Sequence, residues 1–262
     1  MRKEFFFSNL IILVLITLSA FSQNEGVSKF EVSVNGGLSL PVGAYGNNNS
    51  SKSAIYIIGA PETTVKGFSK VKSGFAVPGS SYNLTLKFKM TNNLKLLFQA
   101  SNNNNGVETD GMSVFLTELY NSKETKVEEV NYRVLFFSPG IGYYSSIKKF
   151  ELGINLFVGY SIANYPYYKI IYLYTNLSTP PILAHVGAKP NLSSLTFGTS
   201  LCASYKFTKK LSIGVNILYQ TATFSYNLHP ENYPGGGGSN FDFSDKLKVR
   251  ILNTLVCFGY SF

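Results

Sequence analysis

The feature that most constrains this chain is a period-two alternation of apolar and polar residues, which recurs in eight segments. In residues 82–90, for example, Tyr, Leu, Leu, Phe and Met alternate with Asn, Thr, Lys and Lys. Successive side chains of a β-strand point to opposite faces, so the pattern predicts strands with one apolar and one polar face. An all-β fold is therefore expected.

The connections between these eight segments fall into two classes that alternate strictly. Short turns lie at residues 91–93, 145–148 and 208–210, and the long connections span about 41–80, 102–131, 163–191 and 227–245. Such long loops are uncommon in compact soluble domains, whereas short turns at one end and long loops at the other are typical of outer-membrane barrels. We therefore expect an eight-stranded antiparallel transmembrane up-and-down β-barrel with short periplasmic turns and long extracellular loops.

Alternation alone does not say which face of each strand is outside, and a secreted lipocalin-like barrel or a β-sandwich is the competing fold. The polar face consists mostly of Gly, Ser, Thr and Asn, which suit a narrow lumen better than a surface in water. Only 14% of the residues are charged, against about 25% in an average soluble domain. These observations favour a membrane barrel whose apolar face contacts lipid.

Residues 1–22 have the three parts of a secretory signal peptide. In chain order, these parts are Arg2 with Lys3, the apolar run 5–18, and the small residues Ala20 and Ser22. An uncleaved anchor is the alternative, but the apolar run is shorter than the roughly 20 residues that a helical span needs. We expect residues 23–262 to form the mature barrel domain in the outer membrane of a Gram-negative cell envelope.

The end of the chain carries a family resemblance. Phe258, Tyr260 and Phe262 alternate up to the carboxyl terminus, which resembles the C-terminal signal by which outer-membrane barrels are recognised for assembly. With its eight strands and the segment 139–144 before a short turn, the chain resembles the small barrels grouped with OmpA, OmpX and OmpW. The resemblance implies contact with outer-membrane lipid and lipopolysaccharide, and with the barrel-assembly machinery through the last strand. We expect no peptidoglycan-binding domain of the kind found in full OmpA-type proteins.

The lumen of an eight-stranded barrel is just wide enough for its own side chains, which makes it a poor pore. Six polar side chains are expected to form a network on the inward face. They are Lys87, Lys89, Lys95, Gln99, Glu151 and Lys206. Because buried charges must be paired, a plug of ion pairs is expected, with a proton or ion path as the alternative. Cys202 and Cys257 are expected on the same face with one strand between them, beyond disulfide reach.

The sequence offers little for catalysis. His185 and His229 are the two histidines, and neither belongs to the His-x-Ser arrangement of the lipid A deacylase barrels. Asp242, Ser244 and Asp245 follow His229 closely enough for a surface triad or a weak metal site, but any polar loop offers such neighbours. We therefore assign no catalytic, cofactor-binding or metal-binding residue and expect a non-enzyme. The net charge of +9 is dispersed, so no nucleic-acid partner is expected.

One long loop contains a dense apolar stretch at residues 165–174. Its bulky residues are Tyr167, Tyr168, Ile170, Ile171, Tyr172 and Tyr174. One interpretation is that barrel strands extend beyond the membrane and the loops pack on one another. The other is that this stretch is the contact site for a partner protein or a glycolipid.

These observations predict a non-enzymatic outer-membrane barrel with a structural or binding role, as a single protein or as a subunit of a larger complex. A narrow channel for small solutes and a lipid A-modifying enzyme are the two alternatives. In the favoured interpretation the barrel is a rigid support and the exposed loops carry the function.

Overall fold

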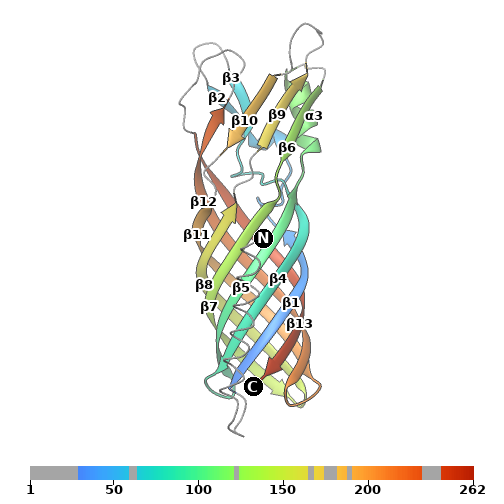
Figure 1. The fold of residues 1–262 in the computed structure, drawn as a ribbon, viewed down its shortest axis with the longest axis vertical. Coiled ribbons are helices and arrows are strands. Elements are labelled where there is room, and N and C mark those ends of the chain that lie inside the picture. The colour runs from blue at the N-terminus through green and yellow to red at the C-terminus, as the bar shows by residue number, and fades with distance from the viewer. Residues whose placement is uncertain are drawn as a thin grey trace, which may run out of the picture.

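The computed structural model describes residues 29–58, 64–120, 124–164, 168–173, 182–187, 191–231 and 243–262. Eight long strands form an antiparallel ring in which neighbours in sequence are neighbours in space (Figure 1). The strands are β1 (Phe30–Pro41), β4 (Ala76–Lys89), β5 (Leu94–Val107), β7 (Tyr132–Ile147), β8 (Phe150–Asn164), β11 (Leu192–Lys206), β12 (Leu211–Glu231) and β13 (Phe243–Ser261). The ring closes because β13 pairs with β1 and β11 pairs with β12. The predicted eight-stranded up-and-down barrel is confirmed, whereas the expected signal peptide at residues 1–22 lies outside the described residues.

Near the short turns, the outer face of the wall is apolar. Large exposed side chains in this part include Val34, Tyr82, Leu156, Leu195, Phe197 and Phe258, each between 58% and 68% exposed. The inward face of the same strands carries buried polar residues such as Asn35, Asn83 and Ser200, together with one small apolar cluster of Leu97, Phe157, Leu218 and Leu255. A soluble barrel would have the opposite arrangement, so this part of the wall faces lipid, as the sequence predicts. We call it the membrane section.

Above the membrane section, the two faces exchange their character. On β12 and β13 the change occurs at the pair Tyr219 and Leu252, which lie directly opposite each other. Beyond this pair most inward residues of β12 and β13 are apolar and buried, for example Phe224 and Val249 at 0% exposure, and Gln220 and Asp245 are the polar exceptions. The outward residues there are polar, for example Thr223. This part of the wall, the extracellular section, is therefore built like a water-soluble protein around an apolar core.

The long connections form a cap on the extracellular section (Figure 1). Strands β10 (Ile182–Gly187), β9 (Tyr168–Leu173) and β6 (Glu124–Glu129) continue the sheet from the upper end of β12. β2 (Ala54–Ile58) pairs with β3 (Thr64–Phe68) in a separate two-stranded sheet, and the helices in the described part of the chain are α2 (Ser50–Ser53) and α3 (Asp110–Tyr120). The interpretation that strands extend beyond the membrane and that loops pack on one another thus holds for the described part of the cap.

Helix α3 covers the free edge of β6. The backbone N–H of Thr125 donates to Thr117 Oγ1 at 2.8 Å, and that of Val127 donates to Ser113 Oγ at 2.9 Å. These bonds satisfy donors that an edge strand would otherwise present to other chains. No helix among the described residues is long and apolar enough to cross a membrane.

One boundary expected from the sequence is wrong. The run of asparagines at residues 102–105, assigned above to a loop, belongs to β5 and pairs with β4 and β7. Asn103 and Asn105 point inward at 0% exposure. The Asn105 amide donates to the carbonyl oxygens of Ser39 and Val77 at 3.1 and 3.0 Å. Asparagine is depleted in strands, but here carbonyl acceptors in the lumen replace water for Asn105, whereas neither amide atom of Asn103 has a partner among the described residues.

Candidate functional sites in the lumen and the cap

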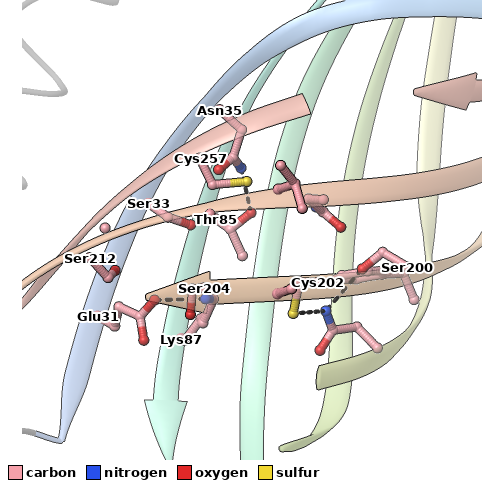
Figure 2. Close-up of a pocket in the computed structure, with 17 residues that line it drawn as sticks. Glu31, Ser33, Asn35, Thr85, Lys87, Ser200, Cys202, Ser204, Ser212 and Cys257 are labelled. Carbon is pink, nitrogen blue, oxygen red and sulfur yellow. Dashed lines mark hydrogen bonds and ion pairs between the residues drawn. The ribbon is translucent and has the colours of Figure 1, made fainter. Parts of the chain in front are cut away.

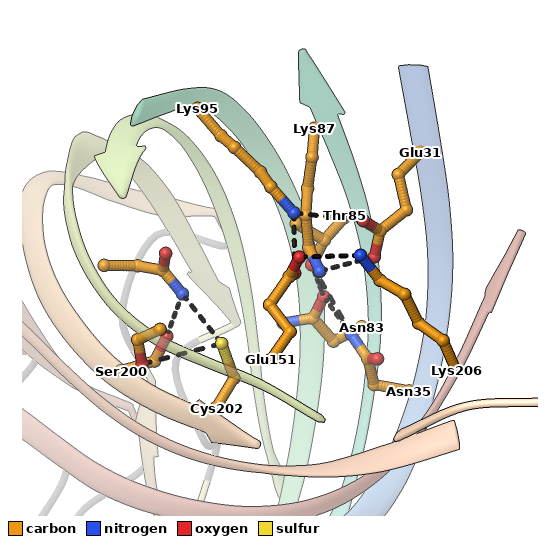
Figure 3. A network of polar contacts seen from close by, with 12 residues as sticks. Glu31, Asn35, Asn83, Thr85, Lys87, Lys95, Glu151, Ser200, Cys202 and Lys206 are labelled. Carbon is orange, nitrogen blue, oxygen red and sulfur yellow. Dashed lines mark hydrogen bonds and ion pairs between the residues drawn. The ribbon is translucent and has the colours of Figure 1, made fainter. Parts of the chain in front are cut away.

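A network of ion pairs crosses the lumen near the short turns (Figure 3). Glu31 Oε1 lies 2.6 Å from Lys87 Nζ, and Glu151 Oε1 lies 2.6 Å from Lys95 Nζ. Lys95 also lies 3.3 Å from Glu31 Oε2, and Lys206 Nζ lies 3.0 Å from Glu151 Oε2. The five residues come from β1, β4, β5, β8 and β11, so the network fastens five strands to one another.

Sequence reasoning found four of these five residues. It missed Glu31, although the alternation of β1 places that residue on the same inward face as Ser33 and Asn35. Gln99 was expected in the network but is buried farther along β5, where neither atom of its side-chain amide has a partner among the described residues. Lys89 is not among the paired lysines either. It lies at the last position of β4, next to the turn.

A cavity of about 30 Å³ lies beside this network (Figure 2). Its lining includes Glu31, Lys87, Asn155, Cys202 and Cys257. A water molecule needs at least about 10 to 15 Å³ of such volume, so the cavity has room for about two waters and for no larger solute.

The two cysteines line this cavity as free thiols. Strand β12 lies between them, because Cys202 pairs with Asn216 and Cys257 pairs with Gly214. The expected inward position of both cysteines is confirmed.

A buried ion pair lies in the cap. Lys70 Nζ contacts both carboxylate oxygens of Glu129 at 3.0 Å, and both side chains are 0% exposed. The ammonium also lies 4.9 Å from the centre of the Phe75 ring. Burial raises the pKa of the Glu129 carboxyl, and the positive charge of Lys70 opposes this shift. The pKa of the neighbouring Tyr45 hydroxyl is also raised, first by burial and then by the charge of Glu129.

Asp245 connects the same part of the cap to the barrel wall. Its carboxylate accepts from the Lys70 backbone N–H at 2.8 Å, the Ser69 hydroxyl at 2.8 Å and the Tyr226 hydroxyl at 2.7 Å. Together, Asp245 and the Lys70 ion pair join the segment after β3 to β6, β12 and β13. The described part of the cap is therefore fastened to the wall by buried polar contacts.

Two of the residues considered for a surface triad around His229 lie on opposite faces of β13. Asp245 points inward, whereas Ser244 is exposed on the other face of β13 and donates to Asn227 Oδ1 at 2.9 Å. The backbone of His229 pairs with Gly187, and Asp242 lies outside the described residues. No group of three potential metal ligands occurs among the residues that the structure describes.

The candidate contact stretch 165–174 is only partly described. Ile170 is 0% exposed and belongs to the apolar core of the cap, and Ile171 on the opposite face of β9 is half-buried. Tyr168 and Tyr172 are placed in β9 by backbone pairing with β6 and β10. Tyr167 and Tyr174 lie outside the described residues. Ile170 thus serves packing, and the contact role stays a prediction for the other five residues.

The C-terminal aromatics lie on the outer face of the membrane section. Phe258 is 61% exposed and Tyr260 39% exposed, and the rings of Tyr260 and Phe262 are 4.8 Å apart. The three residues line a shallow outer groove together with Val32, Val34 and Leu211. They are thus placed for lipid contact, while their recognition by the assembly machinery stays a prediction.

Comparisons with known proteins give structural likeness only. No protein-family model and no curated protein matches the chain. Among solved structures, Neisserial surface protein A is similar with a TM-score of 0.41 and 11% identity, over 91% of this chain and 100% of that one. A major outer membrane protein from Thermus thermophilus has a TM-score of 0.44 and 11% identity, over 90% and 100%. The Escherichia coli outer membrane protease OmpT has a TM-score of 0.37 and 11% identity, over 92% and 99%.

At these TM-scores the likeness carries no information about activity, and the assignment rests on the barrel itself. Its closed ring, apolar outer band and polar lumen are the features of an outer-membrane β-barrel. Such a barrel lies among the lipids and lipopolysaccharide of the outer membrane.

Proposed function

We propose that this outer-membrane barrel is a non-enzymatic protein that holds a rigid extracellular cap as a binding surface, alone or as a subunit of a larger complex. The observation that carries the proposal is the construction of the cap. Strands β6, β9 and β10 extend the wall outward, and the buried Lys70–Glu129 pair and Asp245 fasten the described loops to it. A surface held this way loses little conformational entropy when a partner binds.

The lumen supports this proposal over a solute channel. Its lower part holds the Glu31, Lys87, Lys95, Glu151 and Lys206 network, and its upper part is filled by apolar side chains such as Phe136 and Phe224. The cavity between the polar residues is about 30 Å³. We expect no ion conductance above background when the purified barrel is inserted into planar bilayers, and steady single-channel steps would favour the channel instead.

A lipid A-modifying activity has no comparable support. Of the residues considered with His229, Ser244 points out of the wall and Asp245 points in, so these two do not share one site. We expect the lipid A mass spectrum of cells that overproduce the protein to be unchanged.

The binding role is tested on the stretch 165–174. The protein is purified in mild detergent with and without Tyr167→Ser, Tyr168→Ser, Tyr172→Ser and Tyr174→Ser, and co-purifying proteins are compared. The matched control replaces Val114 and Val130, which are 59% and 61% exposed elsewhere on the cap, with Ser.

Folding is measured in each sample by the difference in gel mobility between boiled and unboiled protein. Loss of a partner in the tyrosine variant, with folding intact and the control unchanged, is the expected result. Recovery of every partner by the folded tyrosine variant would exclude this stretch as the contact site.

A further inference from the structure

Three cations stand in a row on the outer face of β13, at Lys246, Lys248 and Arg250. Their intervening neighbours Leu247 and Val249 are buried at 0% exposure. Because successive side chains of a strand point to opposite faces, the three cations point away from the barrel. Alternate residues of a strand are about 6.8 Å apart, so the row extends over about 14 Å. We call these residues the β13 cation row.

The row begins where the apolar outer band ends. The next outward residue on β13 is Leu252, which is followed by Thr254, Val256 and Phe258 on the lipid-facing side. Leu252 pairs with Tyr219, which marks the boundary between the membrane section and the extracellular section. Arg250 is therefore at the level where lipid headgroups of the outer leaflet meet the barrel, and the two lysines lie farther out.

Hydroxyl groups accompany the row on the neighbouring strand. Thr221 pairs with Arg250, Thr223 with Lys248 and Ser225 with Lys246. Directly opposite residues have Cβ atoms about 4.5 to 5.5 Å apart on the same face of a sheet. Each cation thus has a hydroxyl beside it, and both groups donate hydrogen bonds to phosphate oxygens.

No member of the row forms an ion pair with another described residue. Seven ion pairs occur in that part of the chain, and none includes a member of the row. Asp245, the carboxylate closest in sequence, faces inward and accepts from Ser69, Lys70 and Tyr226. Three cations on one face of a strand produce a positive potential that attracts an anionic ligand.

The side chain of Arg250 lies near Gly43, in the loop that follows β1. A Cβ atom at position 43 would be at ordinary van der Waals distance from it, 3.4 Å from Arg250 Nη1. Gly43 has a φ of 61°, a conformation that glycine adopts without strain. A side chain at position 43 would therefore contact Arg250, and glycine leaves this space beside the guanidinium open.

From this arrangement we infer that the β13 cation row binds the phosphate groups of an anionic glycolipid in the outer leaflet, with the acyl chains of that lipid lying against the apolar band below. The row has three positive charges with hydroxyl donors beside them, and it begins just above the apolar band. These properties match a lipid headgroup that carries more than one phosphate. Arginine suits such a site because its planar donors bind phosphate in a bidentate manner.

The test uses the full-length folded protein in detergent and a diphosphorylated lipid A as the probe. The variant carries Lys246→Gln, Lys248→Gln and Arg250→Gln, and binding is measured by native mass spectrometry over a lipid titration. Each Lys or Arg near an anionic membrane surface contributes about 1 kcal/mol, so we expect affinity to fall about a hundredfold. The same lipid with its phosphates removed should bind the unmodified protein as weakly as the diphosphorylated lipid binds this variant.

The matched control carries Lys149→Gln, Lys209→Gln and Lys210→Gln, which remove the same charge from exposed turns at the periplasmic end. It should bind as the unmodified protein does, and a Lys246→Arg, Lys248→Arg variant should retain affinity. Affinity of the glutamine variant within twofold of the unmodified protein would overturn the inference. Equal binding of the phosphate-free lipid would also overturn it. Inorganic phosphate binding as tightly as the lipid would show a free-anion site and overturn the assignment to a glycolipid.

Discussion

The membrane section and the extracellular section are made of the same strands but place opposite side chains on the outside. On β13 the outward residues change from Phe258 and Val256 to Arg250 and Lys248, while the inward residues change from Asn253 to Val249. One continuous strand thus presents apolar side chains to lipid in its lower part and polar side chains to water in its upper part. In lipid, polar groups must be enclosed in the lumen, whereas in water apolar groups must be enclosed there.

The difference teaches that burial in this protein depends on height along the barrel. A residue such as Phe224 is protected by the core of the extracellular section, whereas Phe197 is 58% exposed in the structure and covered only by lipid. Substitutions of the same type should therefore have different effects in the two sections. The following predictions test this contrast.

The largest effect is expected at the closing strand of the membrane section. Changing Phe258 and Tyr260 to Ser removes two lipid-facing aromatics together with two-thirds of the alternating C-terminal pattern. We expect the amount of protein in purified outer membranes to fall several-fold, measured by immunoblot. The same replacements at Tyr168 and Tyr172 in the cap should leave that amount nearly unchanged, and normal levels of the Phe258 and Tyr260 variant would contradict the prediction.

A second contrast compares the two phenylalanines. Phe224→Ala leaves a cavity in a fully buried core and should lower the free energy of unfolding by about 3 to 5 kcal/mol. Phe197→Ala should cost less, because lipid refills the space on the outer face. Denaturant titration of the barrel reconstituted in vesicles, followed by tyrosine fluorescence, measures both. Equal losses of unfolding free energy in the two variants would contradict the distinction between the membrane section and the extracellular section.

A third contrast introduces one charge at two heights on the outer wall. Val256→Lys puts an ammonium against lipid and should cost about 2 to 4 kcal/mol if the residue is near the bilayer midplane. Thr223→Lys puts it in water but directly opposite Lys248, so repulsion between like charges should lower the free energy of unfolding by no more than about 1 kcal/mol. The same titrations measure both, and a large loss for Thr223→Lys would show that the hydrocarbon reaches higher than Tyr219.

The smallest effect is expected from the buried carboxyl of the cap. The pKa of Glu129 is raised in the folded protein, so the folded state holds a proton that the unfolded state releases as the pH rises above about 4.5. The contribution of Glu129 to stability should therefore decrease as the pH rises from 4.5 toward the folded-state pKa and stay constant above it.

Replacing the carboxyl isolates this contribution. Unfolding of the cap is followed between pH 4 and 8 for the unmodified protein and for Glu129→Gln. The difference between the two curves removes the contribution of other carboxyls such as Asp245. A difference that stays flat, or that grows in favour of the unmodified protein as the pH rises, would contradict the prediction.

Much of the membrane section could be predicted from the sequence because its signals are local. The alternation in residues 82–90 and the turn at 91–93 define a hairpin without reference to the rest of the chain. The inward side of that pattern also identifies Lys87 as a lumen residue. The partner of Lys87 could not be found this way, since Glu31 is 56 residues away and only the register of β1 against β4 places the two residues opposite each other.

The cap shows the opposite case. Lys70, Glu129 and Asp245 lie in segments whose sequences resemble polar loops, and nothing local indicates that their side chains are buried. The position of Asn103 was predicted wrongly for the same reason. A run of asparagines resembles a loop when the lumen that encloses its inward side chains is not known. The sequence likewise does not distinguish Ile170 from Ile171. Ile170 becomes a core residue and Ile171 a half-buried one only because β9 lies between β6 and β10.

The sequence by itself therefore determined the strands, the turns, the lipid-facing side and most of the lumen charges, because period-two patterning is a property of each strand alone. Tertiary structure decided the closure of the ring, the pairing of buried charges and the height at which the wall exchanges its faces. These depend on distances between segments far apart in the chain and on which solvent surrounds each level of the barrel. A residue's own neighbours in sequence do not carry that information.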